Sequence, residues 1–206
     1  MESTSLRVYG GVAGDDRQAE RRATLIEAGL ELLGAPEGGP SLTVRGVCKQ
    51  AGLAARYFYE SFADRDTLAV AVFDHVTEQL ATATLAAVES ARSDTTAKVR
   101  AGVGTIVRQI AEDPRHGRLL FSPGLSIPVL LHRRVESSRM FARLLGGQVR
   151  EYYGLTDTVW LELVTEFLVG GLAQTLTSWL NGTLRLSEAQ MVEHCTELFQ
   201  LLGESR

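Results

Sequence analysis

Three side chains that stand close together in the sequence, Arg56, Tyr57 and Tyr59, have the chemistry needed to read DNA. An arginine guanidinium can donate two hydrogen bonds to O6 and N7 of guanine, and a tyrosine can touch a thymine methyl group or donate to a phosphate. The same residues would also suit an ordinary solvated helix face. The pattern around them must therefore decide between the two interpretations.

The net charge of the chain is −4, which argues against a protein that coats nucleic acid or an anionic membrane through bulk charge. A sequence-specific DNA-binding protein needs only a few cations on one face, and net charge does not report their placement. The charge therefore leaves specific DNA binding open.

The chain has two cysteines, Cys48 and Cys195, too few for a disulfide framework or a metal site made mainly of thiolates. We expect both to be reduced core residues. Its four histidines are far apart and show no metal-binding spacing. No segment resembles a nucleophile elbow, a phosphate-binding glycine loop or a zinc-protease helix. We therefore expect no metal, no cofactor and no enzyme activity.

The most apolar segment, 161–180, is interrupted by Glu162, Glu166 and Gln174, which argues against a membrane span. Residues 1–16 lack the basic start and apolar core of an export signal. These features predict a cytoplasmic protein.

Hydrophobic spacing predicts an all-α protein of about nine helices, because apolar residues recur every three or four positions and no segment alternates like a strand. We expect a flexible arm at 1–16, a three-helix N-terminal domain at 17–64 and a C-terminal helical bundle at 65–206. Short, broken segments are expected between Pro114 and Pro128. The expected helices are 17–34, 44–51, 55–61, 65–92, 94–112, 130–153, 158–180 and a last one that opens with a capping box at Ser187 and Gln190.

The segment 43–62 has the spacing of a helix-turn-helix. Thr43 can cap a helix that begins at Val44, and Gly52 suits the left-handed turn that ends it. Small or apolar residues occupy the positions at which two helices must cross closely, namely Val47, Cys48, Ala51, Leu53 and Phe58. A DNA-binding helix-turn-helix places its second helix in the major groove. Here that helix would present Arg56 and Tyr59.

The residues that carry a family likeness are Thr43-Val44-Arg45, Ala51-Gly52-Leu53, Tyr57-Phe58-Tyr59-Glu60-Ser61-Phe62 and Asp64-Arg65-Asp66-Thr67-Leu68. Together they closely resemble the N-terminal DNA-binding domain of the TetR family of bacterial transcriptional regulators, over about residues 21–72. The resemblance implies a homodimer that binds an inverted repeat in double-stranded DNA, most often as a repressor, and that a small-molecule effector releases. It also implies phosphate contacts from Thr43, Arg45, Tyr59 and Arg65, with Ala55, Arg56 and Tyr57 nearest to the bases.

The sequence departs from the family pattern at two positions and has one further oddity. Ala54 stands where Ser or Thr is usual, so the second helix lacks a capping hydroxyl. Ser61 stands where His is frequent. Glu60 would repel phosphate unless it accepts from cytosine or pairs with Arg56 or Arg65. Ala54 and Glu60 motivate an alternative, a helical small-molecule binding protein that has lost specific DNA binding.

We expect an effector pocket within the C-terminal bundle and a dimer interface on its last two helices, since 160–180 is apolar nearly all round and needs cover on more than one face. Each pocket candidate could equally be ordinary core. The pocket candidates are Phe73, Phe121, Met140, Leu144, Trp160, Phe167 and Gln174. The interface candidates are Leu172, Leu176, Trp179, Met191, Cys195, Leu198 and Phe199.

Overall fold

The computed structural model describes residues 12–36, 41–121, 127–153 and 158–203, and within these ranges it contains helices and no strand. The expected all-α class with about nine helices is confirmed. The helices are α1 (Val12–Leu33), α2 (Val44–Ala51), α3 (Ala55–Ser61), α4 (Arg65–Ser90), α5 (Thr95–Glu112), α6 (Pro114–Phe121), α7 (Pro128–Tyr153), α8 (Thr158–Leu180) and α9 (Glu188–Gly203).

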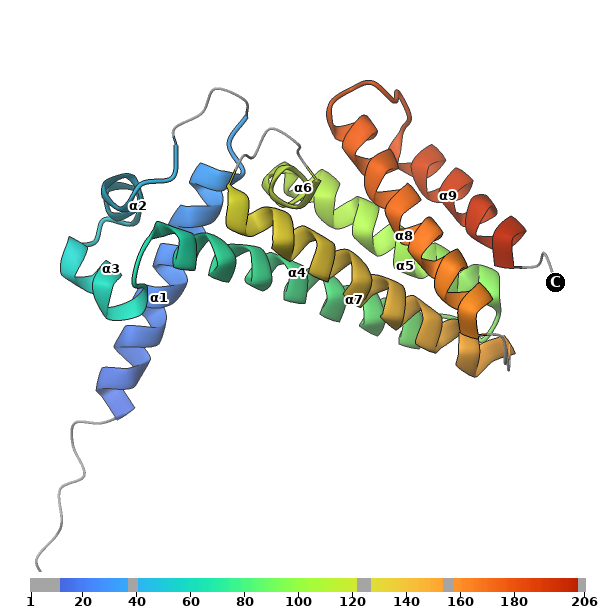
Figure 1. Ribbon diagram of the computed structural model, residues 1–206, viewed down its shortest axis with the longest axis horizontal. Helices are drawn as coiled ribbons and strands as arrows, with labels where there is room; N and C mark the ends of the chain where they lie inside the picture. The colour runs from blue at the N-terminus through green and yellow to red at the C-terminus, as the bar shows by residue number, and fades with distance from the viewer. Residues whose placement is uncertain (1–11, 37–40, 122–126, 154–157, 204–206) are drawn as a thin grey trace, which may run out of the picture.

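The molecule is elongated, with α1, α2 and α3 forming a head at one end (Figure 1). The helices α4 and α7 run lengthwise from the head, and α5, α8 and α9 form the opposite end. Contacts join α4 to α5 and α7, α7 to α8, and α9 chiefly to α5. The short α6 packs against both α1 and α8, so it links the head to the far end.

Side-chain caps fix the boundaries of the helices in the head. The Thr43 hydroxyl accepts a hydrogen bond of 3.0 Å from the backbone N–H of Gly46, which starts α2. Gly52 ends α2 with φ of 66°, a left-handed conformation that glycine adopts without strain. The Asp64 carboxylate accepts a hydrogen bond of 2.7 Å from the N–H of Thr67 and starts α4.

Two expected boundaries were wrong and one cap is confirmed. Residues 12–16 belong to α1 rather than to a flexible arm, whose remaining part lies outside the described residues. The segment after Pro114 is a helix, α6, because proline suits the first turn of a helix. At α9, Ser187 and Gln190 form the expected capping box, with reciprocal hydrogen bonds of 3.0 and 3.3 Å.

One continuous hydrophobic core joins the head to the bundle. Leu25 of α1, Val47 of α2, Phe58 of α3 and Leu68 of α4 all have 0% exposure and meet beneath the head. The same cluster continues along α4 and reaches α6 and α7 through Val72, Phe73, Val76, Leu80, Leu119 and Leu130. The head is therefore not a separately packed unit.

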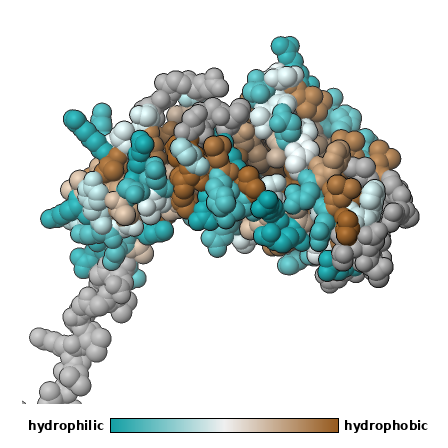
Figure 2. Space-filling view, in the orientation of Figure 1, coloured by the Kyte–Doolittle hydropathy of each residue, from teal (hydrophilic) through white to brown (hydrophobic). Residues whose placement is uncertain are grey.

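A second hydrophobic cluster fills the space between α5, α8 and α9. Several residues that we expected at the dimer interface belong to this cluster instead. Leu176, Met191 and Cys195 are buried there inside one chain, and Leu172 and Trp179 pack against them. The outward side of these helices carries other apolar side chains, and Figure 2 shows apolar surface over this end of the molecule. The exposed residues are Val159, Leu163, Phe167, Leu198 and Leu201.

The stretch Val159–Leu180 is long and apolar enough, by length and composition, to cross a membrane, with a mean hydropathy of 1.3 over its most apolar window. Only 22% of that window is buried. The same helix nevertheless packs Leu161, Leu168 and Leu176 into the interior of the bundle. The other side of this helix is apolar and exposed in the single chain.

The ends of α1 and α6 meet tightly at Gly34. A Cβ atom at this position would lie 2.5 Å from Cβ and 2.8 Å from Cα of Arg115. The Arg118 Nε atom donates a hydrogen bond to the Gly34 carbonyl. Arg115 also forms ion pairs with Glu27 and Glu31 of α1, at 2.7 and 2.6 Å. Only a residue without a side chain fits this junction.

We predict that Gly34→Ala lowers the free energy of unfolding by about 1–3 kcal/mol, since the added methyl group must push α6 away from α1. Gly147→Ala is the matched control, because Gly147 is exposed on α7 and a Cβ there meets nothing within 4 Å. This control should stabilise the helix by about 0.5–1 kcal/mol. Urea unfolding of both variants measures the difference, and equal stability would contradict the tight junction.

Candidate nucleic-acid interface and ligand cavity

The turn between α2 and α3 fixes which side of α3 faces outward. The backbone N–H of Leu53 donates to the carbonyl of Cys48 at 3.0 Å and closes the turn after Gly52. Phe58 is fully buried on the inner side, and its ring meets that of Tyr59 edge-on at 5.4 Å. Ala55, Arg56 and Tyr59 are exposed on the outer side, with Tyr59 at 61% exposure.

Tyr57 holds Arg56 in place rather than pointing freely outward. An Arg56 Nη atom donates a hydrogen bond of 2.6 Å to the Tyr57 hydroxyl, and the guanidinium carbon lies 4.6 Å from the centre of the Tyr57 ring. The guanidinium of Arg21 from α1 lies 4.7 Å from the same ring. Tyr57 is half-buried between these two cations. Arg56 keeps its remaining N–H groups for another acceptor.

Glu60 pairs with Arg21 of α1, a partner that the sequence analysis did not consider beside Arg56 and Arg65. Its carboxylate lies 3.6 Å from an Nη atom of Arg21, and Gln18 donates to its backbone carbonyl at 3.5 Å. Both residues that approach Glu60 belong to α1. A partly exposed pair of this kind contributes little to stability, but it compensates the negative charge on α3.

Three of the four expected phosphate contacts lie at the starts of two helices, whereas Tyr59 lies within α3. Thr43 uses its oxygen to cap α2, which leaves its O–H free to donate. Arg45 is exposed on α2. Arg65 begins α4, donates to the Leu42 carbonyl at 3.5 Å and is 60% exposed in its side chain. Arg45 and Arg65 are therefore cations with exposed side chains on the two helices that adjoin α3 in the sequence.

Ala54 occupies the N-cap of α3 without a side-chain cap, as the sequence predicted. Its backbone is extended, with φ of −70° and ψ of 149°, which is the usual conformation of an N-cap residue. The backbone alone therefore starts this helix.

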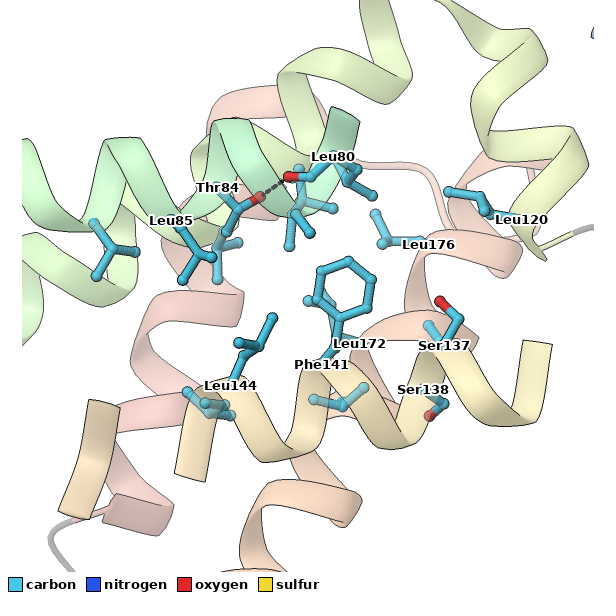
Figure 3. Close-up of a pocket in the computed structure, with 18 of the residues that line it drawn as sticks. Leu80, Thr84, Leu85, Leu120, Ser137, Ser138, Phe141, Leu144, Leu172 and Leu176 are labelled. Carbon is cyan, nitrogen blue, oxygen red and sulfur yellow. Dashed lines mark hydrogen bonds between the residues drawn. The ribbon is translucent and has the colours of Figure 1, made fainter. Parts of the chain in front are cut away.

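A cavity of about 390 Å³ lies among α4, α5, α6, α7 and α8 (Figure 3). The Phe141 ring projects from α7 into its middle, opposite Leu80 and Thr84 of α4. Its lining is mostly apolar, and its size falls in the ordinary range for small-molecule sites.

The cavity collects some expected residues and leaves out others. Phe73, Phe121 and Leu144 line it. Among the described lining residues, Met140, Trp160, Phe167 and Gln174 do not occur, and Phe167 is 67% exposed on the outer side of α8. Three residues expected at the dimer interface line it instead, namely Leu172, Leu176 and Phe199.

Sequence reasoning missed all of the described α5 wall, including Val99, Val103 and Ile106, and also the α7 residue Phe141. An apolar residue at helical spacing gives the same signal whether it faces a cavity or a filled core. Polar lining residues would have given a better signal, since Arg134, Ser137 and Ser138 share one side of α7.

Solved structures of similar fold cover nearly the whole chain. A TetR-family transcriptional regulator from Streptomyces coelicolor has a TM-score of 0.69 at 20% identity, and the match covers 89% of this chain and 80% of that one. The chain has the TetR-family fold. A TetR family transcription regulator from Marinobacter aquaeolei VT8 matches with a TM-score of 0.63 at 22% identity, covering 92% of this chain and 97% of that one.

The transcriptional regulator FadR from Bacillus subtilis, solved in complex with stearoyl-CoA, has the same fold, with a TM-score of 0.69 at 17% identity over 89% of this chain and 98% of that one. No family model and no curated protein matches the sequence. In this chain, α2, the turn at Gly52 and α3 form a helix-turn-helix in the head, and the bundle contains a cavity.

We predict that Ala54→Ser raises the free energy of unfolding by about 0.5–2 kcal/mol, because the added hydroxyl can accept from a free N–H in the first turn of α3. Ala55→Ser is the matched control, since residue 55 already lies inside the helix and cannot cap it. Thermal unfolding of both variants measures the effect. A gain of the same size in the control would show that capping is not its cause.

Proposed function

We propose that the protein is a homodimeric transcriptional regulator, a repressor that binds an inverted-repeat operator and is released by a small-molecule effector in the bundle cavity. In this proposal, residues 17–64 bind DNA, residues 65–206 bind the effector and form the dimer, and the protein acts in the cytoplasm without a cofactor or enzyme activity. The observation that carries it is the exposed Arg56 on the outer side of α3, within a TetR-family fold.

The head has two features that suit specific binding. Arg56 is ordered by Tyr57, so less side-chain entropy is lost when it meets a base. Thr43, Arg45, Tyr59 and Arg65 offer donors around α3 for phosphates. Phosphate contacts would fix the register of the head, and Arg56 would supply discrimination between bases.

The homodimer is supported by the apolar side of α8 and α9 that the single chain leaves exposed. Val159, Leu163 and Phe167 recur along α8 at helical spacing, and each is more than 60% exposed. Leu198 and Leu201 extend the surface onto α9. A second copy related by a two-fold axis would cover these residues and present two heads to successive major grooves.

Two connections can carry a signal from the cavity to the head. Helix α4 starts directly after α3 and lines the cavity with Phe73 and Leu80. Helix α6 lines the cavity with Leu120 and Phe121 and is tied to α1 through Arg115. An effector that favours one arrangement of α4 and α6 would change the separation of the two heads. Release is then a shift between two populations.

The first test is selection of random duplex DNA on the purified protein at a fixed salt concentration near physiological. We predict an enriched inverted repeat, which Arg56→Ala weakens by about 1–3 kcal/mol with a relaxed base preference at one position. Arg139→Ala is the matched control, because Arg139 is exposed on α7 outside the head. It should leave the operator affinity unchanged.

Absence of any enriched sequence would instead favour the alternative function, a ligand-binding protein without specific DNA recognition. The observation that supports this alternative is the start of α3 at Ala54, which has no side-chain cap. Operator affinity that no bound effector changes would contradict the release mechanism while leaving DNA binding intact.

We predict that Phe167→Asp raises the dimer dissociation constant at least about tenfold, because a carboxylate would be buried in an apolar interface. Val135→Asp is the matched control, since Val135 is 49% exposed on α7 and lies outside the α8 and α9 surface. Sedimentation velocity over a range of concentrations measures both. A variant that stays dimeric as tightly as the unmodified chain would remove this surface from the interface.

A further inference from the structure

The charged residues among the described lining of the cavity are Lys98 of α5 and Arg134 of α7, and both are cations. No aspartate or glutamate occurs among these lining residues. The rest of the described wall is apolar apart from hydroxyls and one amide. A cavity of this composition has a positive potential in a medium of low dielectric, which favours an anion.

Arg134 has a hydrogen-bond donor that no described residue satisfies. One of its Nη atoms donates to the carbonyl of Leu119 at 2.9 Å. Its Nε atom is buried and has no hydrogen-bond partner among the described residues. Burial lowers the pKa of the Arg134 guanidinium. A buried donor on a charged group without a partner costs stability. An anion close to the Arg134 guanidinium would offset part of this cost.

The nearby acids are engaged with the neighbouring residue Arg133. Its guanidinium lies 3.4 Å from Asp74 and 3.2 Å from Glu136. Arg133 is also absent from the described cavity lining, whereas Arg134 belongs to it. Arg133 is therefore paired with carboxylates and lies outside the described lining. Arg134 borders the cavity and forms no ion pair with a carboxylate among the described residues.

Ser137 and Ser138 extend the polar region along α7. They stand three and four positions after Arg134, so all three residues share one side of the helix. Figure 3 shows Ser137 pointing toward the cavity on the same helix as Phe141, and Ser138 also belongs to the described lining. Beyond them the described wall is apolar and includes Leu80, Leu144 and Leu172. The cavity thus combines one polar region with a long apolar wall.

We infer that the cavity takes an amphiphile made of an apolar chain with an anionic head, and that the head pairs with the guanidinium of Arg134. The hydroxyl of Ser137 can donate to the same head. The inference rests on the proposed function in that it takes this cavity as the effector site. The anion can be the carboxylate of a free fatty acid or the phosphates of its coenzyme A thioester, which share this chemistry.

The test measures binding of dodecanoate, dodecanol and dodecylamine to the full chain by calorimetry, below the concentrations at which they form micelles and without DNA. These probes share one chain and differ in head-group charge. We expect dodecanoate to bind at least about tenfold more tightly than dodecanol, and dodecylamine to bind more weakly than both. Dodecanoyl-CoA is the further probe that identifies the source of the anion.

The variant Arg134→Gln should lose the preference for dodecanoate over dodecanol to within about twofold and leave dodecanol binding unchanged, because the uncharged head group of dodecanol forms no ion pair with Arg134. Arg133→Gln is the matched control and should keep the preference, since it removes the same charge from the adjacent position outside the lining. If dodecanoyl-CoA binds more tightly than dodecanoate and depends on Arg134, the thioester is the source of the anion. Weaker binding of the thioester identifies the free acid.

Three outcomes would overturn the inference, namely no binding of either anionic probe, equal binding of dodecanoate and dodecanol, or a preference that survives in Arg134→Gln. The comparison of the three head groups on the unmodified chain needs no variant, so a misfolded Arg134→Gln protein would not block the test. Because DNA is absent, failure here leaves the operator experiment unaffected, and failure to find an operator leaves this result valid.

Discussion

The structure depends on one shared hydrophobic core that begins under α3 and ends beside the cavity. Phe58 anchors α3 against Leu25 and Leu68, and the same cluster includes Phe73 and Leu80, which line the cavity. Protein interiors are densely packed, so a displacement at one end of such a cluster cannot be absorbed locally. The position of α3 and the shape of the cavity are therefore properties of the same packing. Under the proposed function, a ligand in the cavity would therefore change the position of α3 through this core, and no separate hinge is needed.

The ion pairs between α6 and α1 play a different part from this core. Arg115 pairs with Glu27 and Glu31, and its hydrogen bonds to Asp113 hold the pKa of that carboxyl below its ordinary value. The glutamates are about half exposed, so solvent screens these pairs and they contribute little to stability. These ion pairs instead help to set the position of α6 along α1, while Gly34 allows the close distance between the two helices. Apolar packing supplies the stability, and the ion pairs select the arrangement.

The sequence was sufficient to predict α2, α3 and the start of α4, because local chemistry determines their boundaries. Thr43, Gly52 and Asp64 act through their own backbone neighbours, so the helix boundaries follow from residue type and spacing. The partner of Glu60 could not be predicted in this way. Arg21 lies far from it in sequence, and only the packing of α1 against α3 brings the two together. Local signals predict caps and turns, whereas charge partners across helices depend on the tertiary structure.

The bundle was harder to predict for the opposite reason. Helix α8 is apolar nearly all round, so its sequence cannot show that Leu176 faces the interior and Phe167 the outside. Arg134 was overlooked because a cation beside Arg133 on an amphipathic helix looks solvated, and only the structure shows that it borders the cavity. Its hydrogen bond to the Leu119 carbonyl connects this wall to α6, which Arg115 joins to α1. An anion at Arg134 would therefore act on a residue already linked to the helix that holds the head.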